Sequence, residues 1–294
     1  MAVLYIKEQG AMIQKNGERI IVTKNHKQLL DVPVLHIENI AVIGNVQIST
    51  QALHLLMEKG VDVSYLSYSG QYLGHTAAEA SKNIFLRFEQ YRFYMDERRR
   101  LEMAKCIVRN KIENQMAVIR QHRWNEEYDW KADIRSMETL LTSIPKKETA
   151  NELLGVEGKI LSIAYTLLTK EICNSLDAES FEPYLGFLHG IRYGRKSLAL
   201  DLVEEFRQPI VDRLVILLFN KRMIGKYDFT FEEEGRVLLN EDGFCKFCSE
   251  YERWMNGKNT ASGESSFRTK IREQIALLKR VISKGETYKP YSWR

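Results

Sequence analysis

Residues 81–124 of the chain read SKNIFLRFEQYRFYMDERRRLEMAKCIVRNKIENQMAVIRQHRW. The stretch contains neither glycine nor proline, the residues least favourable inside a helix, and its apolar side chains recur at helical spacing. It therefore predicts one or two long helices. It also marks a boundary, because strand signals dominate the chain before it and nearly vanish after it.

Before this boundary, short β-prone runs alternate with turn residues. In residues 2–25, AVLYIKEQGAMIQKNGERIIVTKN, the pair Asn16-Gly17 between two apolar runs is a strong hairpin signal. The remaining signals are a strand over residues 34–45, a short helix between Ser49 and Gly60, and a strand pair around Ser69-Gly70.

After the boundary, helical periodicity continues to a last predicted helix over residues 267–284, which follows a loop of flexible composition over residues 255–266. Together the patterns predict an α+β protein. Its parts are a small β-rich N-terminal domain over residues 1–76, a linker over residues 77–83, and a larger all-α C-terminal domain over residues 84–294.

The composition is typical of a soluble globular protein, with 294 residues, 44% hydrophobic and 28% charged. No uninterrupted apolar run approaches the roughly 18 to 20 residues that span a bilayer, and the first apolar run is too short for a signal peptide. We therefore predict a cytoplasmic protein without a membrane segment.

The positive charge of the chain is concentrated in its centre. The formal net charge is +4, whereas residues 82–123 alone carry eleven Lys and Arg against five Asp and Glu, a local net charge of +6. Such a segment suits the phosphate backbone of DNA, although solvated helix faces would have the same composition.

The four cysteines do not make a convincing metal site. Cys245 and Cys248 form a CxxC pair, but a structural zinc ion needs two further Cys or His ligands. Neither a second CxxC pair nor a histidine after His189 is present, so we predict free thiols.

Residues 149–158 place a carboxylate where an apolar residue is expected. Thr149 and Glu152 form a capping box, so a helix should begin near Ala150. Glu157 then falls on the apolar stripe of that helix, where an unpaired carboxylate costs several kcal/mol. It is explained either by an ion pair with Arg or Lys or by a bound cation.

A second carboxylate group lies in residues 197–206, SLALDLVEEF. Asp201 and Glu204 are three residues apart and share one helix face, opposite an apolar face. An ordinary amphipathic surface helix would give the same pattern. His189 lies just upstream after an apolar turn, where a histidine is usually a satisfied core residue.

Taken together, Glu157, His189, Asp201 and Glu204 supply carboxylate oxygens and one imidazole, a set that suits Mn²⁺ or Mg²⁺ better than zinc. Guanidinium and ammonium groups suited to phosphate lie near them in the sequence: Arg192, Arg195, Lys196 and Arg207. From the residues alone, the chemistry is that of a metal-dependent enzyme of phosphoryl transfer.

Three segments resemble one known family. LLGVEG at residues 153–158, LSIAYTLL at 161–168 and PYLGFLHGIRYGRKSLALDLVEEFRQPIVDR at 183–213 closely resemble the CRISPR-associated integrase family, the Cas-one (Cas1) proteins. The similarity covers nearly the whole chain, including the β-rich N-terminal domain, the helical C-terminal domain and the aromatic tail.

The resemblance implies roles for individual residues. The metal ligands of the family correspond to Glu157, His189 and Glu204, and Asp201 corresponds to a supporting acid of the catalytic set. Tyr165 corresponds to an aromatic position near the active site, and it joins the four basic residues above as a candidate for DNA contact.

The resemblance also implies a function. The family forms homodimers, which the N-terminal domain would make, and these are bridged by a smaller partner, Cas-two (Cas2). With Mg²⁺ or Mn²⁺, the assembly inserts short double-stranded DNA fragments into a CRISPR array, where a 3′-hydroxyl attacks a phosphodiester of the repeat. The alternatives are a stand-alone metal-dependent DNA endonuclease and a catalytically impaired DNA-binding scaffold.

The chain departs from the family pattern at one place. More sequence normally separates the motif around Glu157 from the motif around Tyr165, whereas here Gly158 and Lys159 run directly into ILSIAYTLL. Either the protein lacks this segment, or the printed chain has been joined across a loop. In the first case, Glu157 and Tyr165 share one continuous helix and basic contacts near the site are missing.

Overall fold

The computed structural model describes residues 2–68, 70, 72–76, 83–121, 130–144, 162–231, 237–257 and 265–293. The chain forms two compact units. The first comprises Met1–Ala80 with Thr230–Asn240, and the second comprises Ser81–Phe229 with Glu241–Arg294. Residues 230–240 thus belong with the first unit, although the sequence assigned them to the C-terminal domain. The predicted linker lies outside the described residues except for Asn83.

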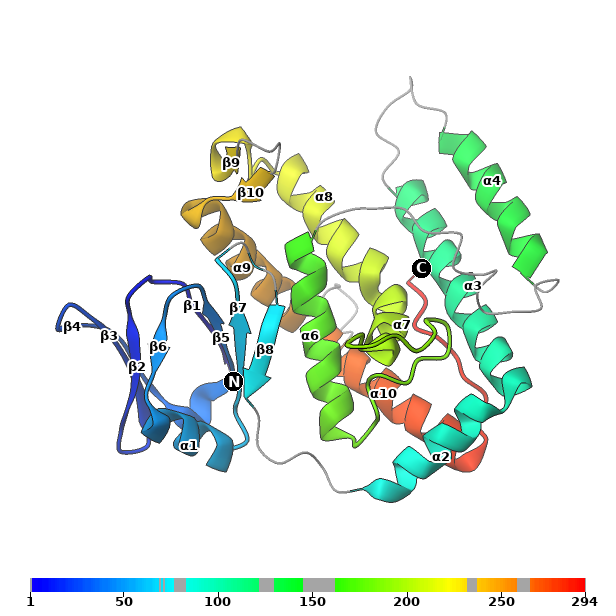
Figure 1. Cartoon of the computed structure of the whole chain (residues 1–294). Helices are drawn as coiled ribbons and strands as arrows, with labels where there is room; N and C mark the ends of the chain where they lie inside the picture. The colour runs from blue at the N-terminus through cyan, green and yellow to red at the C-terminus, as the bar shows by residue number, and fades with distance from the viewer. Residues whose placement is uncertain are drawn as a thin grey trace. The chain divides into compact units, whose positions relative to one another are not determined.

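Two four-stranded sheets build the N-terminal unit (Figure 1). One has the order β1-β5-β7-β8, formed by Ala2–Ile6, Ile37–Ile43, Asp62–Leu66 and Tyr72–Thr76. The other has the order β4-β3-β2-β6, formed by Lys27–Pro33, Arg19–Lys24, Met12–Asn16 and Gln47–Ile48. The core includes Ile13, Ile20, Ile40, Leu55 and Leu56, all at most 1% exposed.

Local signals in the sequence explain these elements. The predicted hairpin at Asn16-Gly17 is confirmed, because Asn16 lies opposite Arg19 in the antiparallel pair β2 and β3, and Gly17 adopts a positive φ of 59°. The predicted short helix is α1, Thr50–Glu58, and the hydroxyl of Ser49 accepts a hydrogen bond from the backbone N–H of Ala52 at 3.2 Å.

The second unit is mainly helical. The α-helices described in it are α2 (Ile84–Met95), α3 (Glu97–Gln121), α4 (Trp130–Ser143), α6 (Ser162–Ala178), α7 (Ser197–Phe206), α8 (Arg213–Asn220), α9 (Glu241–Asn256) and α10 (Phe267–Lys284). The described part of the 81–124 stretch, residues 83–121, therefore contains two helices, and they divide at Asp96, whose carboxylate accepts a hydrogen bond from the backbone N–H of Arg99 at 3.1 Å.

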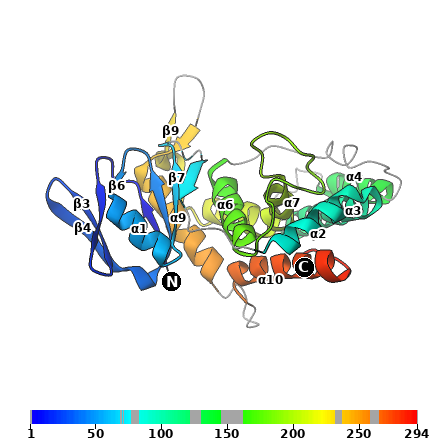
Figure 2. The ribbon, with the colours of Figure 1, turned by 60° about the horizontal axis from the view of Figure 1, so that its bottom comes forward.

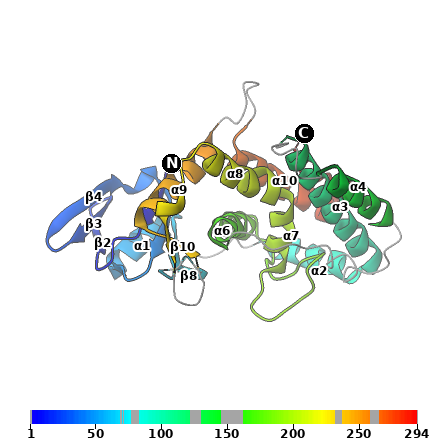
Figure 3. The same ribbon diagram turned by 90° about the horizontal axis from the view of Figure 1, so that it is seen from above.

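Helix α7 lies at the centre of this unit. It packs between α3 and α6, as Figures 2 and 3 show from two directions. Helix α10 packs against α2, α6 and α9. Its predicted span, 267–284, is confirmed by a Ser266 cap at one end and by Gly285, at φ 72°, at the other.

The α+β class is confirmed, but the prediction that the C-terminal part is all-α is wrong. Two short strands, β9 (Phe229–Phe231) and β10 (Val237–Leu239), pair in a two-stranded sheet. Their apolar runs, FTF and VLL, are strand-prone but only three residues long, too short for a periodicity to be recognised. Among the helices that the structure describes, none combines the length and apolarity required to cross a membrane.

Candidate active site

Asp201 of α7 organises the loop before it. Its carboxylate accepts three backbone hydrogen bonds, from the N–H groups of Phe187 at 2.5 Å, Leu188 at 3.0 Å and His189 at 2.9 Å. The side chain is fully buried. A buried carboxylate is tolerated when such donors replace its hydration, so Asp201 fixes the turn that carries His189.

Gly186 makes this close approach possible. A β-carbon at Gly186 would lie 2.8 Å from a carboxylate oxygen of Asp201 and 2.7 Å from the carbonyl carbon of Ser197. Any other residue would therefore push the loop away from the start of α7 and break the three hydrogen bonds to Asp201. The GFLH turn needs glycine for packing, because no side chain fits there.

The imidazole of His189 is held by the same carboxylate. Its Nδ1 lies 2.7 Å from Oδ1 of Asp201, and the residue is 8% exposed. Because the carboxylate accepts, the Nδ1–H of a neutral ring donates to it, and Nε2 keeps its lone pair. A carboxylate that orients a histidine in this way is the usual support of a metal-binding imidazole.

Glu204, one helical turn beyond Asp201, is buried beside two cations. The ammonium of Lys111 on α3 lies 2.9 Å from its Oε2, and the guanidinium of Arg207 lies 3.8 Å from its Oε1. Lys111 is 3% exposed and Glu204 5% exposed. The sequence did not single out Lys111, because its partner lies 93 positions away and nothing local distinguishes it from the other basic residues of α3.

Tyr165 of α6 joins the site through Arg207. The Arg207 guanidinium lies 4.4 Å from the centre of the Tyr165 ring, and the tyrosine hydroxyl donates a hydrogen bond of 2.5 Å to Asp212. Burial raises the pKa of Asp212, and burial followed by the charge of Asp212 raises the pKa of Tyr165. The tyrosine is therefore protonated at neutral pH and serves as a donor.

Arg207 and Asp212 are the ends of a π-helical turn that links α7 to α8. Widened turns of this kind frequently occur at functional sites, since they change the direction in which side chains leave a helix. Here the turn contains Pro209, which has no backbone N–H for a regular α-helical bond. Asp201 and Asp212 therefore do not lie on one continuous α-helical face.

The other predicted phosphate contacts lie on the loop between His189 and α7. Arg195 is used within the loop, since its guanidinium donates to the carbonyl of Gly190 at 2.5 Å and to the hydroxyl of Ser197 at 3.2 Å. Lys196 lies 3.9 Å from a carboxylate oxygen of Asp177 on α6. Arg192 is exposed to solvent.

The alternative of an amphipathic surface helix is wrong for residues 197–206. Asp201, Glu204 and Glu205 are all buried, together with the apolar side of α7. The structure forms two sets of contacts that share α7: His189 with Asp201, and Glu204 with Arg207 and Tyr165. Glu157, with its capping box, lies outside the described residues, and within the described ones no group of three His, Cys, Asp or Glu side chains is arranged to hold a metal ion.

The donor set nevertheless fits the predicted Mg²⁺ or Mn²⁺ ion on two observations. The His189 ring offers one nitrogen and has its other nitrogen fixed by Asp201. Glu204 offers two buried carboxylate oxygens, for which a bound cation would compete with Lys111 and Arg207. A third ligand, Glu157 by prediction, would have to come from outside the described residues.

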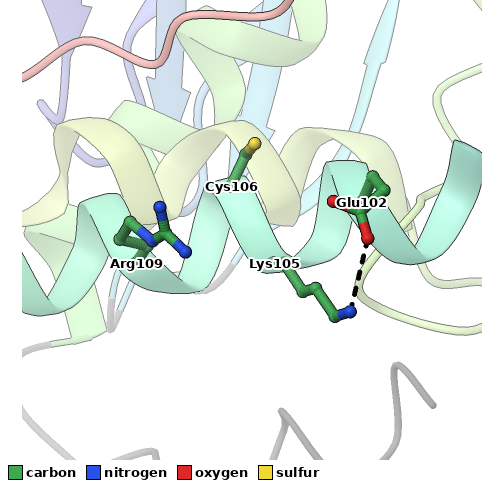
Figure 4. Close-up of a pocket in the computed structure, with 4 residues that line it drawn as sticks. All are labelled: Glu102, Lys105, Cys106 and Arg109. Carbon is green, nitrogen blue, oxygen red and sulfur yellow. Dashed lines mark hydrogen bonds and ion pairs between the residues drawn. The ribbon is translucent and has the colours of Figure 1, made fainter. Parts of the chain in front are cut away.

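The thiols do not add a second site. Cys245 is exposed and Cys248 is buried, and neither of them is in a disulfide. Figure 4 shows a pocket on α3 lined by Glu102, Lys105, Cys106 and Arg109. Burial raises the pKa of the Cys106 thiol despite nearby Arg109, which favours the protonated form of this thiol.

Glu205 has a different environment from Glu204. It is fully buried and accepts hydrogen bonds from the hydroxyl of Tyr288, the amide of Gln274 at 2.9 Å and the backbone N–H of Tyr291 at 3.1 Å. Burial outweighs these donors and raises the pKa of Glu205 from 4.5 to about 7. Glu205 therefore binds a proton in the folded protein at a pH where the unfolded chain has lost it.

This raised pKa predicts a pH-dependent stability. Between pH 4.5 and 7 the folded state retains the Glu205 proton and the unfolded state does not. The proton therefore stabilises the folded state fully at low pH, and this stabilisation is lost as pH rises. Relative to Glu205→Gln, the free energy of unfolding of the wild type should fall by about 3 kcal/mol over this interval. Urea denaturation of both proteins at pH 5 and 7.5 checks it, and parallel pH profiles would contradict it.

Comparison with known proteins agrees with this architecture. The model of the family described as CRISPR-associated protein Cas1 matches residues 4–163 and 159–253. The match is divided into two ranges that overlap over residues 159–163, just after Gly158, where the sequence departs from the family pattern. The family model thus covers more than half of the chain.

Relatives and solved structures extend the comparison. The CRISPR-associated endonuclease Cas1 3 of Thermus thermophilus is 29% identical over 337 positions, which cover all of this chain and 98% of the relative. The alignment exceeds the 294 residues of this chain, so 43 positions of the relative have no counterpart here.

The fold matches solved structures at lower identity. A Cas1 protein from Thermotoga maritima superposes with a TM-score of 0.85 at 20% identity, over 99% of this chain and all of that one. A casposase bound to an integration product superposes with a TM-score of 0.83 at 20% identity, over 97% and 92% of the two chains. On the strength of the family match, this chain belongs to the CRISPR-associated Cas1 family.

Proposed function

We propose that this chain is a metal-dependent DNA integrase that inserts short DNA fragments into a CRISPR array. Three lines of support converge on it. The chain belongs to the Cas1 family, its relatives carry the name endonuclease, and a similar fold occurs in a casposase bound to an integration product. The described site adds an oriented imidazole and a buried carboxylate surrounded by basic groups.

The arrangement of His189 and Asp201 is the observation that carries the proposal. A merely structural histidine has no need of a buried carboxylate that also ties down three backbone N–H groups of its own turn. Such support fixes both the tautomer and the direction of the ring, as binding a cation requires. His189, Glu204 and Glu157 are the proposed ligands, and Asp201 is the supporting acid.

When bound, Mg²⁺ or Mn²⁺ would withdraw charge from the reacting phosphate and favour ionisation of the attacking hydroxyl. The residues of this chain supply the rest. Asp201 holds His189 in place, Lys111 and Arg207 balance the charge of Glu204, and Tyr165 orients Arg207. Arg192 and Lys196 are proposed contacts to the DNA backbone, together with Arg195 at the loop.

The proposed reaction conserves the number of phosphodiester bonds. The 3′-hydroxyl of the fragment loses its proton and forms a new P–O bond with a phosphate of the repeat. The old P–O bond of the repeat strand breaks, and the departing oxygen takes up a proton to become a 3′-hydroxyl. Positioning of the two DNA ends therefore accounts for much of the catalysis.

Partners follow from the same comparison. Similar folds occur in a complex described as Cas6-RT-Cas1–Cas2, so we propose a Cas2 protein and double-stranded DNA as partners. A homodimer formed through the N-terminal unit completes the proposed assembly. The basic segment over residues 82–123 is the proposed contact for the backbone of bound DNA.

Branched DNA tests the reaction with this chain alone. In such a substrate the 3′-hydroxyl of one strand faces the branch, and an integrase joins it to the branch phosphodiester while the flap is released. With Mn²⁺ or Mg²⁺ we expect a rejoined strand on a denaturing gel, and none with a chelator. A dideoxy end at the attacking position should also remove the product.

The outcomes separate the candidate functions. Cleavage without a rejoined strand would favour the endonuclease, in which water replaces the 3′-hydroxyl as nucleophile. DNA binding without either product, and without a specific Mn²⁺ site in a titration, would favour the scaffold.

A further inference from the structure

A strap formed by residues 285–293 crosses the helices that carry the site. Gly285, at a positive φ of 72°, ends α10 and turns the chain. The strap then returns over α3 and α7, as shown by its contacts with Glu205, Asn110 and Asn114. It contains the aromatic residues Tyr288, Tyr291 and Trp293.

The strap grips α7 next to the proposed metal ligand. The hydroxyl of Tyr288 and the backbone N–H of Tyr291 both donate to the carboxylate of Glu205, the residue after Glu204. The ring of Tyr291 stacks on Phe206, with centroids 5.2 Å apart and planes 12° from parallel. Two consecutive residues of α7 are thus fixed by one short segment.

The strap also holds α3 on both sides of Lys111. The carbonyl of Tyr291 accepts hydrogen bonds from the side-chain amides of Asn110 at 2.9 Å and Asn114 at 3.2 Å. The backbone N–H of Trp293 donates to the carbonyl oxygen of the Asn114 side chain at 3.0 Å. Both asparagines are buried, and Asn114 also donates to the backbone carbonyl of Glu205 at 3.0 Å.

These contacts restrain the two partners of the buried ion pair. Neighbouring residues of a helix point about 100° apart, so a helix gripped at Glu205 and Phe206 cannot rotate without moving Glu204. Likewise, α3 is held at Asn110 and Asn114, so it cannot rotate without moving Lys111. The strap therefore restrains the positions of both Lys111 and Glu204, whose charged atoms lie 2.9 Å apart. None of the contacts described above involves either of these two side chains.

We propose that residues 285–293 are a positioning element of the metal site, with Tyr288 and Tyr291 as its anchors on Glu205. This inference rests on the proposed function, because it assigns Glu204 as a ligand whose direction the strap controls. A strap that merely closed the helical unit would contribute to stability alone.

The test uses Tyr288→Phe in the full chain, which removes one hydroxyl and keeps the ring in place. The matched control is Tyr251→Phe, at another buried tyrosine of the same unit, whose hydroxyl has no hydrogen-bond partner in the described part of the chain. Mn²⁺ affinity is measured by titration calorimetry, and the rejoining rate on branched DNA is measured over a range of Mn²⁺ concentrations.

We expect Tyr288→Phe to weaken Mn²⁺ binding by about 10-fold, which is the lower end of the range for residues that support metal ligands. The rejoining rate should fall at low Mn²⁺ and recover in part at saturating Mn²⁺, at a temperature well below melting. Tyr251→Phe should leave both quantities unchanged.

Two results overturn the inference in distinguishable ways. If Tyr288→Phe melts at a lower temperature but binds Mn²⁺ and rejoins DNA as the wild type does, the strap is structural only and the proposed function stands. If the wild type itself binds no Mn²⁺ specifically, the proposed function fails, and the positioning role fails with it.

Discussion

Replacement of His189 by alanine should lower the rate of strand rejoining by about 1,000-fold, because a metal ligand supplies several kcal/mol of transition-state stabilisation. The protein should remain folded. Asp201 would lose the contact with the ring but would keep its hydrogen bonds to the backbone N–H groups of Phe187, Leu188 and residue 189. Rejoining of branched DNA, Mn²⁺ titration and thermal melting together measure the effect.

A graded series makes this prediction more specific. Asp201→Asn keeps the size of the side chain but weakens its hold on the ring, so we expect a loss of about 10- to 100-fold, the range for residues behind a metal ligand. His54→Ala, at an exposed position of α1, is the control and should behave as the wild type. Equal rates for His189→Ala and the wild type would remove His189 from the site.

Much of the fold follows from local sequence signals. The hairpin at Asn16-Gly17, the Ser49 cap of α1 and the span of α10 are determined by residues within a few positions of each other. Each signal has a local physical cause, either a positive φ or a side-chain oxygen that satisfies a free N–H. Such elements can be predicted from one sequence.

The site was predictable only in part. The motifs identified His189, Asp201 and Glu204 as residues of one chemistry, but the sequence could not show which groups Glu204 and its neighbour Glu205 contact. The two adjacent carboxylates turn to different partners, one to Lys111 on α3 and the other to the strap. Those partners lie 93 and 83 positions away, and only the packing of three helices decides which carboxylate meets which group.

Lys111→Met should lower the free energy of unfolding by about 3 to 5 kcal/mol, the cost of removing one partner from a buried ion pair. Lys111 and Glu204 are 3% and 5% exposed, and their charged atoms are 2.9 Å apart. Without the ammonium, the nearest cation in the described site is Arg207 at 3.8 Å. Urea denaturation measures the loss.

Lys105→Met on the same helix is the matched control. Lys105 pairs at 3.3 Å with Glu102, whose side chain is 64% exposed, and such pairs contribute at most about 1 kcal/mol. We expect this variant to lose no more than that. A comparable loss of unfolding free energy in both variants would show that the buried ion pair of Lys111 contributes no more to stability than the exposed pair of Lys105.

The double variant separates an uncompensated charge from lost packing. Lys111→Met with Glu204→Gln removes both charges, so it should be more stable than Lys111→Met alone. Added Mn²⁺ should also raise the melting temperature of Lys111→Met, because a cation bound at Glu204 would replace the missing ammonium and stabilise the folded state by mass action. It should do so much less in the double variant, whose Glu204 position no longer carries charge. If Mn²⁺ stabilised both variants equally, Glu204 would not be a metal ligand, and Lys111 would be its structural partner only.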